Sequence, residues 1–454
     1  MSSGVWEGER SEPEKDRYSF SNLPVQARMF LKLVAIALVL LPAILVLDRI
    51  YLMVKERENY YHQTAQEIAH LWGKEQVIKG PVLSVPFQSK DGRRSYVHIL
   101  PEKLRIEGDL DPEIRQRGIF EAVVYRTELS VNGHFSLKRI QDSLAKINAS
   151  QVFYEQSFVG IGISDTHSLN GSSGFSVDGK QRELRANSGA SGLLGNGIHV
   201  DYSLSPERSN DEISFKEKLK LNGAQSLKIA AVGAQTDVLL KAPWKDPTFV
   251  GRHLPVAKEV SEQGFTAHWD ISHLGQTFGR VVLPGQNTVV KDKLIASSFG
   301  VKLHQPVSPY RLVVRAIKYG LLFLVVTFGF YFLSEMTTRH PVHLVQYLVL
   351  SAPLCLFFLL LLSMAEHFGF VPAYLAGSAI VITMASAYTL SVLASKKKAI
   401  LSAVSLAGLY AALFFMLKEQ DYSLLFGTFT LVALTAVFMW ATKDLTWMSS
   451  KVQE

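Results

Sequence analysis

The segment LVQYLVLSAPLCLFFLLLLSMA, from Leu344 to Ala365, is the clearest part of a nearly continuous apolar stretch that runs from Tyr310 to Thr442. Its few charges fall in clumps, and between the clumps lie segments of about 20 apolar residues, enough for a helix to cross ~30 Å of hydrocarbon. A buried helix of a soluble protein would be shorter and would show polar residues on one face. The stretch therefore predicts five membrane spans: Leu312–Ser334, Leu344–Ala365, Phe370–Ala394, Ala399–Leu417 and Tyr422–Ala441.

Another apolar run, Phe30–Leu47, predicts a span near the N-terminus. Residues 1–27 before it combine mixed charges with little apolar content, which is typical of a disordered cytoplasmic tail. A cleaved signal peptide is the competing interpretation, but the run is long for such a peptide and no small-x-small cleavage site follows it. We therefore interpret residues 28–54 as an uncleaved signal anchor whose helix continues beyond the bilayer.

The composition of the 454-residue chain is 48% hydrophobic and 19% charged, with a net charge of +7. Its mean hydropathy is +0.15. Because the positive charge is scattered and forms no stripe interleaved with aromatic residues, no nucleic-acid partner is expected. Excess Lys and Arg in a membrane protein instead sets its orientation. The single cysteine, Cys355, can form no internal disulfide and is expected to face lipid or another helix.

Residues 55–309 look soluble and mainly β, and Gly80-Pro81 begins the β-rich part. Alternation of apolar and polar residues predicts strands with one buried face around Leu129–Leu137, Ile213–Leu221 and Phe265–Trp269. Asp178-Gly179 and Asn222-Gly223 are predicted to be type I′ hairpin turns. Leu137–Ile147 predicts a short helix, and the Gly- and Ser-rich segment Asn187–Gly197 predicts a mobile loop. The expected fold is a sandwich-like, mainly antiparallel domain inserted between the first two spans.

The charges of the short loops predict the orientation of the spans. With a cytoplasmic N-terminus, the triple lysine Lys396–Lys398 is also cytoplasmic, whereas Glu366, Glu419 and Asp421 are external. The basic residues Arg311, Arg315 and Lys318 then lie on the external flank of the second span, against this rule. The prediction is an α-helical polytopic membrane protein with six transmembrane helices, residues 310–444 forming the main membrane domain, residues 445–454 a cytoplasmic tail and residues 55–309 an extracytoplasmic, periplasmic domain.

Several local matches follow one another in a characteristic order. They are Glu56-Arg57 with Tyr60, Gly80-Pro81 with Pro86, Leu254-Pro255, Glu259–Glu262, Gly264–Trp269, Lys318-Tyr319, Glu335, His343–Leu348 and Glu366–Phe370. With this architecture the chain resembles the CreD family of bacterial inner-membrane proteins, and the long acidic N-terminal tail is its main departure. The resemblance implies a protein of the Gram-negative inner membrane tied to envelope integrity, colicin tolerance and the response to cell-wall damage. It implies no reaction and no catalytic residue.

Three ionisable residues at span boundaries are the candidate functional residues: Glu335, Glu366 and His367. An acid beside an imidazole in a membrane suggests a proton relay or a substrate contact, but neighbours in sequence point to different sides of a helix, so a polar turn that ends the helix is the alternative. Glu335 is placed to pair with Arg339 at i, i+4.

Two pairs of histidines are weak candidates for metal ligands. His340 and His343 are separated by Pro341, which breaks the helix, and no third ligand is evident. His268 and Asp270 share a strand face, whereas His273 does not obviously lie on it. Ser143-x-x-Lys146 matches a serine/lysine nucleophile pattern that is common by chance. No Walker loop, dinucleotide-binding glycine run or HExxH motif is present. Glycines inside the spans are interpreted as sites of close helix approach.

The predicted function is that of a non-enzymatic envelope protein, with no cofactor and no metal. Membrane lipids and an unidentified periplasmic or inner-membrane protein are the expected partners. The alternative is a carrier or lipid-handling protein with a path between its helices, and a membrane hydrolase ranks third. A carrier usually needs ionisable or broken-helix sites at mid-bilayer, whereas the charges beyond the opening flank of the second span lie near span boundaries here.

Overall fold

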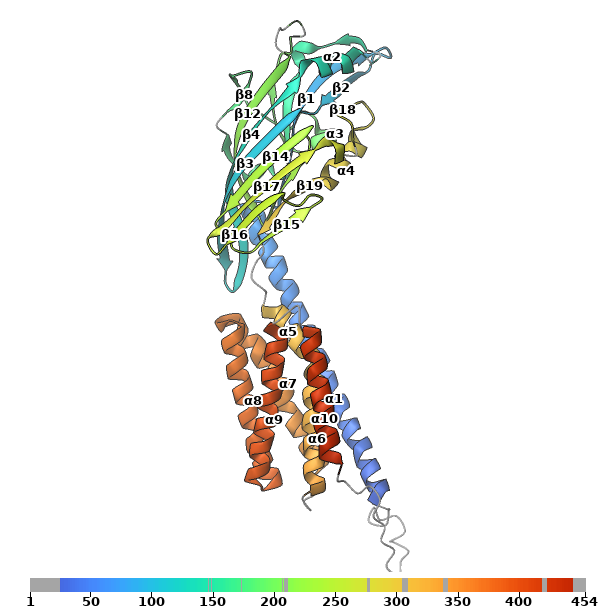
Figure 1. Ribbon diagram of the computed structural model, residues 1–454, viewed down its shortest axis with the longest axis vertical. Helices are drawn as coiled ribbons and strands as arrows, with labels where there is room; N and C mark the ends of the chain where they lie inside the picture. Colours follow the sequence, from blue (N-terminus) through green and yellow to red (C-terminus); the bar gives the residue numbers. More distant parts are fainter. Residues whose placement is uncertain are drawn as a thin grey trace, which may run out of the picture. The chain divides into compact units, whose positions relative to one another are not determined.

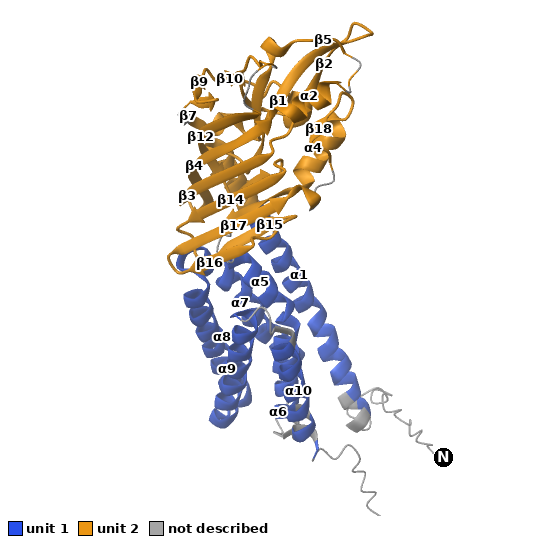
Figure 2. Ribbon diagram, turned by 45° about the horizontal axis from the view of Figure 1, so that its top comes forward, with its two compact units in different colours: residues 1–59, 307–454 blue, residues 60–306 orange. Residues whose placement is uncertain are grey.

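The computed structural model describes residues 25–145, 147, 149–172, 174–205, 207, 211–275, 278–303, 309–337, 342–418 and 423–443 (Figure 1). Two compact units divide the chain: a helical unit, Met1–Asn59 with Val307–Glu454, and a β unit, Tyr60–Pro306 (Figure 2). Helix α1 (Val25–Trp72) contributes its first part to the helical unit and its last turns to the β unit. The predicted tail, residues 1–27, lies almost wholly outside the described residues.

The β unit contains two sheets, which have ten and nine strands in the described residues. The first sheet consists of β1 (Gln76–Ser89), β2 (Arg94–Ile99), β5 (Ala149–Val152), β6 (Phe158–Ile163), β10 (Arg185–Ala186), β11 (Gly197–Asp201), β13 (Ser226–Ala230), β15 (Pro247–Gly251), β18 (Val281–Val282) and β19 (Ser298–Leu303). The second consists of β3 (Lys103–Arg117), β4 (Phe120–Ser136), β7 (Leu169–Ser172), β8 (Phe175–Val177), β9 (Lys180–Arg182), β12 (Glu212–Ala224), β14 (Gln235–Ala242), β16 (Ala257–Ser261) and β17 (Gly264–Ser272). Most pairs are antiparallel, whereas β1–β13 and β3–β14 are parallel.

The two sheets share one apolar core, which the alternating sequence pattern produces. Along β12 every second side chain is buried as far as Leu221, because successive side chains of a strand point to opposite faces. Trp269 of the second sheet is fully buried, and its ring lies 5.8 Å from that of Phe249 and 5.6 Å from that of Phe299, both in the first sheet. This confirms the predicted mainly β fold and the strands around Leu129, Ile213 and Phe265.

The structure confirms one of the two predicted hairpin turns and contradicts the other. Asp178-Gly179 joins β8 to β9 with φ values of 53° and 73°, as a type I′ turn requires. The prediction for Asn222-Gly223 is wrong, because both residues lie inside β12, where Gly223 pairs with Tyr125. A Cβ atom on Gly223 would overlap the Tyr125 ring, so this glycine makes room for a buried aromatic residue rather than for a turn.

Two helices and one packed segment complete the β unit. The predicted helix is confirmed as α2 (Leu137–Ala145), and α4 (Asn287–Ala296) lies beside the first sheet. The predicted mobile loop, Asn187–Gly197, is instead a packed segment that contains a short helix, α3 (Ser191–Leu194), with Leu193 and Leu194 fully buried. Gly189 of this segment lies directly against the ring of Phe158, where a Cβ atom would overlap the ring.

Besides the first part of α1, the helical unit contains six helices in its described residues. They are α5 (Pro309–Lys318), α6 (Gly320–Thr337), α7 (Leu344–Phe368), α8 (Phe370–Leu393), α9 (Lys396–Lys418) and α10 (Ser423–Thr442). Within the described ranges, four helices are long and apolar enough to cross a membrane, and α5 with α6 forms a fifth candidate that is bent by 41°. The predicted span Leu312–Ser334 therefore falls on two helices, with the break between Lys318 and Gly320. Helix α5 carries Arg311, Arg315 and Lys318 on one stripe, so it is amphipathic, whereas α6 is apolar.

Helix α1 packs through a single buried stripe formed by Ile36, Ala43, Leu47, Ile50 and Val54, while most of its other apolar side chains in the helical unit are exposed. Exposed apolar surface on helices of this length is what a lipid-facing helix presents. Cys355 is buried, with its Sγ atom 3.8 Å from the Ala43 carbonyl oxygen, so it faces a helix rather than lipid.

The glycines of the spans do not all have the predicted role. Gly320 lies where a Cβ atom would meet Leu47 and Phe358, which confirms a close helix approach. Gly408 faces open space, so for this residue the prediction is wrong.

Candidate functional site

Glu335, in the last turns of α6, belongs to a polar cluster made by four helices. Lys32 of α1 donates a hydrogen bond to Glu335 Oε1 and another, of 3.0 Å, to the carbonyl oxygen of Val342. The Lys32 and Glu335 side chains are 25% and 15% exposed, so the ion pair is largely shielded. The predicted partner, Arg339, lies outside the described residues, as do His340 and Pro341.

Two more side chains complete this Glu335 cluster, which we define as Lys32, Glu335, Tyr347 and Lys398. Lys398, at the start of α9, donates a 2.6 Å hydrogen bond to the Ser334 carbonyl oxygen. The carbonyl groups of the last helical turn have no partner within the helix, and a cation at this end also interacts favourably with the helix dipole. The Tyr347 hydroxyl of α7 lies beside Glu335. These contacts link α1, α6, α7 and α9 at one end of the helical unit.

A chain of hydroxyl groups lies close to this cluster. The Tyr331 hydroxyl is 2.6 Å from Thr389 Oγ1, which is 3.4 Å from Ser402 Oγ. Thr389 also donates to the Ala385 carbonyl oxygen within its own helix, α8. These groups are buried and neutral at physiological pH, so they link α6, α8 and α9 by hydrogen bonds without adding charge.

Glu366 lies at the opposite end of α7 and is bound to α5. The Tyr310 hydroxyl donates a 2.8 Å hydrogen bond to Glu366 Oε1. In the next turns of α5, Arg315 donates to the carbonyl oxygen of Met416, 3.2 Å away, in the last turn of α9. These four residues form what we call the Glu366 cluster. It fixes α5 against the ends of α7 and α9.

His367 does not join the Glu366 cluster. It is exposed, and its ring lies 6.4 Å from that of its neighbour Phe368, which is 68% exposed. The contact of Glu366 that the structure shows is with Tyr310, so the two predicted site residues point to different surroundings, as adjacent positions on a helix must. Gly369, with φ of 80°, then ends α7.

In the β unit, residues of the predicted metal and nucleophile patterns form hydrogen bonds with neighbouring protein groups. His268 Nε2 is 2.9 Å from Asp237 Oδ2 on the neighbouring strand β14. No group of three His, Cys, Asp or Glu side chains that could hold a metal occurs among the described residues. Ser143 donates its hydroxyl hydrogen to the Arg139 carbonyl oxygen one turn earlier in α2, and Lys146 lies outside the described residues.

A buried histidine in the β unit was missed by the sequence argument. His98 of β2 is 2% exposed, its Nδ1 atom lies 2.8 Å from Ser84 Oγ, and burial lowers its pKa from 6.5 to about 4. It is therefore neutral at physiological pH and has a packing role. Val97, His98 and Ile99 are buried one after another, so no alternation of polar and apolar residues marks His98 as buried.

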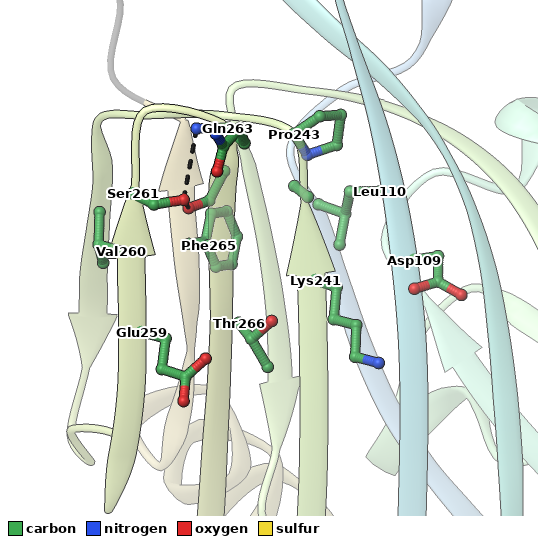
Figure 3. Close-up of a pocket in the computed structure, with 12 residues that line it drawn as sticks. Asp109, Leu110, Lys241, Pro243, Glu259, Val260, Ser261, Gln263, Phe265 and Thr266 are labelled. Atoms are coloured by element: carbon green, nitrogen blue, oxygen red, sulfur yellow. Dashed lines mark hydrogen bonds between the residues drawn. The ribbon is translucent and has the colours of Figure 1, made fainter.

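An open hollow lies at one edge of the second sheet, where β16 and β17 form a hairpin (Figure 3). Asp109 of β3, Lys241 of β14 and Glu259 of β16 contribute charges to its wall. All five residues of β16 are exposed, and Leu254 and Val256 just before it are 71% and 65% exposed. Among the described strands β16 pairs with β17 alone, so it is an edge strand of the second sheet.

The sequence does not identify Lys32 and Tyr310 as partners of Glu335 and Glu366, because these contacts join helices that are far apart in the chain. Lys32 interrupts an apolar run, and a charge inside a span signals a partner without identifying it. Tyr310 carries no such signal, because a tyrosine at the end of a span is equally typical of an interfacial anchor.

Comparison with known proteins agrees with the sequence pattern. The sequence model of the family described as inner membrane protein CreD matches residues 28–448. The chain is 28% identical, over 424 residues and 91% of each chain, to the inner membrane protein CreD of Escherichia coli (strain K12).

Solved structures give only remote likenesses. M1 zinc metallopeptidase from Deinococcus radiodurans gives a TM-score of 0.18 at 8% identity over 38% of each chain. A point mutant of that enzyme, bound to a tripeptide substrate, gives 0.21 at 10% identity over 78% of this chain and 95% of that one. Scores this low carry no argument. The match to the family model covers most of the chain, and so this multi-pass inner membrane protein belongs to the CreD family.

Proposed function

We propose that the protein supports the integrity of the bacterial cell envelope and its response to cell-wall stress, without catalysing a reaction. In this proposal six helices span the inner membrane, α5 with α6 counting as one and α10 as the last. Both termini are cytoplasmic, and residues 55–309 lie in the periplasm. The β unit binds a protein partner or the membrane surface, and the helices anchor it.

The best support for this proposal is a difference between the two units: the charges singled out in the helical unit contact other helices, whereas the β unit leaves groups exposed that a partner could bind. The charged residues of the helical unit that the sequence singled out, Glu335 and Glu366, contact neighbouring helices at opposite ends of α7. The β unit instead presents an exposed edge strand, β16, and apolar side chains beside it. Adding a strand to such an edge is a common way to bind an extended peptide.

A carrier is the second candidate, and one observation favours it. The 41° bend between α5 and α6 breaks a span, and broken helices line the substrate sites of many transporters. The ionisable groups next to this break, however, belong to α5 and lie before the apolar helix α6 begins.

The proposal is tested by complementation of an envelope-stress defect in a strain that lacks the gene. Replacing Tyr60–Ser308 by a short flexible linker should abolish complementation while the helices remain abundant in isolated membranes. Normal complementation by this deletion would overturn the role of the β unit. Crosslinking in intact envelopes should capture a partner through residues added at β16 and not through matched positions on the buried strand β13.

Topology is tested separately with reporter fusions. A fusion after Lys398 should be active only with a cytoplasmic reporter, and a fusion near Gln305 only with a periplasmic one. Both fusions on the same side would contradict the six-span arrangement.

A further inference from the structure

Helix α5 presents a basic stripe that the proposed function does not use. Arg311, Arg315 and Lys318 follow one another at i, i+4 and i+7, so they lie on one side of the helix. Arg311 and Lys318 are exposed and Arg315 is half-buried, whereas Val313, Ala316 and Ile317 are buried on the other side. Three positive charges therefore lie within about 10 Å along the helix axis.

The structure fixes this stripe in place. Tyr310 bonds Glu366 at the end of α7, and Arg315 bonds the Met416 carbonyl oxygen at the end of α9. The acidic side chain at this end, Glu366, is thus bound to a tyrosine. In the described part of the chain, no ion pair between an acidic residue and any of the three cations is seen. Glu419 and Asp421, which follow α9, lie outside the described residues.

An apolar helix with exposed side chains follows the stripe directly along the chain. Directly after α5 the chain bends by 41° into the apolar helix α6, whose Leu321 and Val325 are 45% and 48% exposed. An amphipathic basic helix beside exposed apolar side chains matches a phospholipid, whose phosphate lies above its acyl chains. Guanidinium groups bind phosphate oxygens through paired hydrogen bonds, and an adjacent ammonium group adds charge.

We infer that α5 carries a binding site for the phosphate of an anionic phospholipid headgroup, held by Arg311, Lys318 and the free edge of Arg315, with the acyl chains along α6. The inference does not rest on the proposed function, since it requires only that α5 lie at a membrane surface. It also accounts for three basic residues at a span end where the orientation predicted from loop charges would not place them.

The test is competition between lipids for the full-length protein in nanodiscs, with fluorescent phosphatidylglycerol as the probe and equally labelled phosphatidylcholine as the neutral reference. The wild-type protein should retain the anionic probe preferentially. Arg311→Gln/Lys318→Gln should reduce that preference about 25-fold, at about fivefold for each cation removed. Arg315 is left unchanged, because it also holds the end of α9.

Two controls make the result decisive. Lys396→Gln/Lys397→Gln removes the same charge from exposed positions at the start of α9 and should change the preference less than twofold. Arg311→Lys/Lys318→Arg keeps the charge and should retain most of the preference. Equal losses in both glutamine variants, or no loss in either, would overturn the site, the latter being the outcome if Glu419 and Asp421 neutralise the stripe. Displacement of the probe by millimolar glycerophosphoglycerol as efficiently as by lipid would show a site for soluble phosphate and would overturn the lipid assignment.

Discussion

Two ion pairs, one from each unit, differ in how far their side chains are exposed. In the β unit Lys218 and Glu128 pair across β12 and β4 with side chains that are 47% and 46% exposed, outside an apolar core. In the helical unit Lys32 and Glu335 pair between helices with side chains that are 25% and 15% exposed, inside an apolar surface. The difference is the one expected between a unit that folds in water and one that folds in lipid.

The comparison shows where a single charge matters. A surface pair in water is screened and replaced by hydration when one partner is lost. A pair between membrane helices has no such replacement, so the remaining partner is left without compensation. The same chemical pair is therefore expected to contribute little to the stability of the β unit and more to that of the helical unit.

The largest expected effect comes from Lys32→Met. It removes the ion-pair partner of the largely buried Glu335 carboxylate and should destabilise the helical unit by about 3 kcal/mol, the lower part of the range for breaking a buried pair. The measurement is the amount of protein in isolated membranes, together with thermal unfolding in detergent. Lys218→Met in the β unit is the matched control and should leave both quantities unchanged.

A rescue variant separates charge from packing in this test. Lys32→Met/Glu335→Gln removes both charges, so it should recover most of the lost abundance. If the double variant is as low in abundance as Lys32→Met, the ion pair does not stabilise the packing of these helices. The expected difference between the two units is then wrong for this pair.

Two glycines, one in each unit, differ in how closely other side chains pack against them. Gly223→Ala should destabilise the β unit by about 2–3 kcal/mol, because the new Cβ atom would overlap the buried Tyr125 ring, which has no room to move. Gly408→Ala should leave the helical unit as stable or slightly more so, since the added atom faces open space and alanine favours a helix. Thermal unfolding of each full-length variant, followed by hydrogen exchange in β12 and α9, checks both. If Gly223→Ala leaves the stability of the β unit unchanged, the Tyr125 ring has room to move.

Acid should weaken the β unit through His98. Burial lowers the pKa of its imidazole to about 4, below the usual 6.5, so the contribution is fully present above pH 6.5 and is lost as the pH falls towards 4. Between pH 8 and pH 5 this loss is about 2 kcal/mol. Hydrogen exchange in β1 and β2 of the full-length protein, corrected for intrinsic rates, measures it. His98→Gln should flatten the dependence, and an unchanged slope in that variant would assign the acid sensitivity to other groups.

How far the sequence predicts the structure differs between the two units as well. Uniform apolar length predicts the long apolar helices, and period-2 alternation predicts β4, β12 and β17, because both patterns follow from local surroundings. The bend at Tyr319 was missed since apolar length does not show a change of axis. Asn222-Gly223 has the composition of a turn, but Tyr125, far earlier in the chain, decides its conformation. The partners of Glu335 and Glu366, Lys32 and Tyr310, come from other helices, which no local pattern predicts.

The smallest expected effect concerns the pair of residues that first suggested a proton path. Glu366→Gln/His367→Gln keeps polarity and approximate volume, and a glutamine oxygen can still accept the hydrogen bond from Tyr310. Among the described residues the His367 side chain has no hydrogen bond or ion pair, and it is exposed. If both residues only end α7 and support α5, the stability change should stay below about 1 kcal/mol.

We therefore expect the double variant to be as abundant as the wild type in isolated membranes and to complement the envelope defect fully. Tyr310→Phe/Glu366→Gln is the matched comparison, because it removes the hydrogen bond itself and should lower only the thermal stability, by about 1 kcal/mol. A Glu366→Gln/His367→Gln protein that is abundant but inactive would show that an ionisable group is needed at this end of α7. That outcome would move the functional centre from the β unit to the helical unit and favour the carrier, since loss of a structural contact lowers abundance whereas loss of a proton-binding group does not.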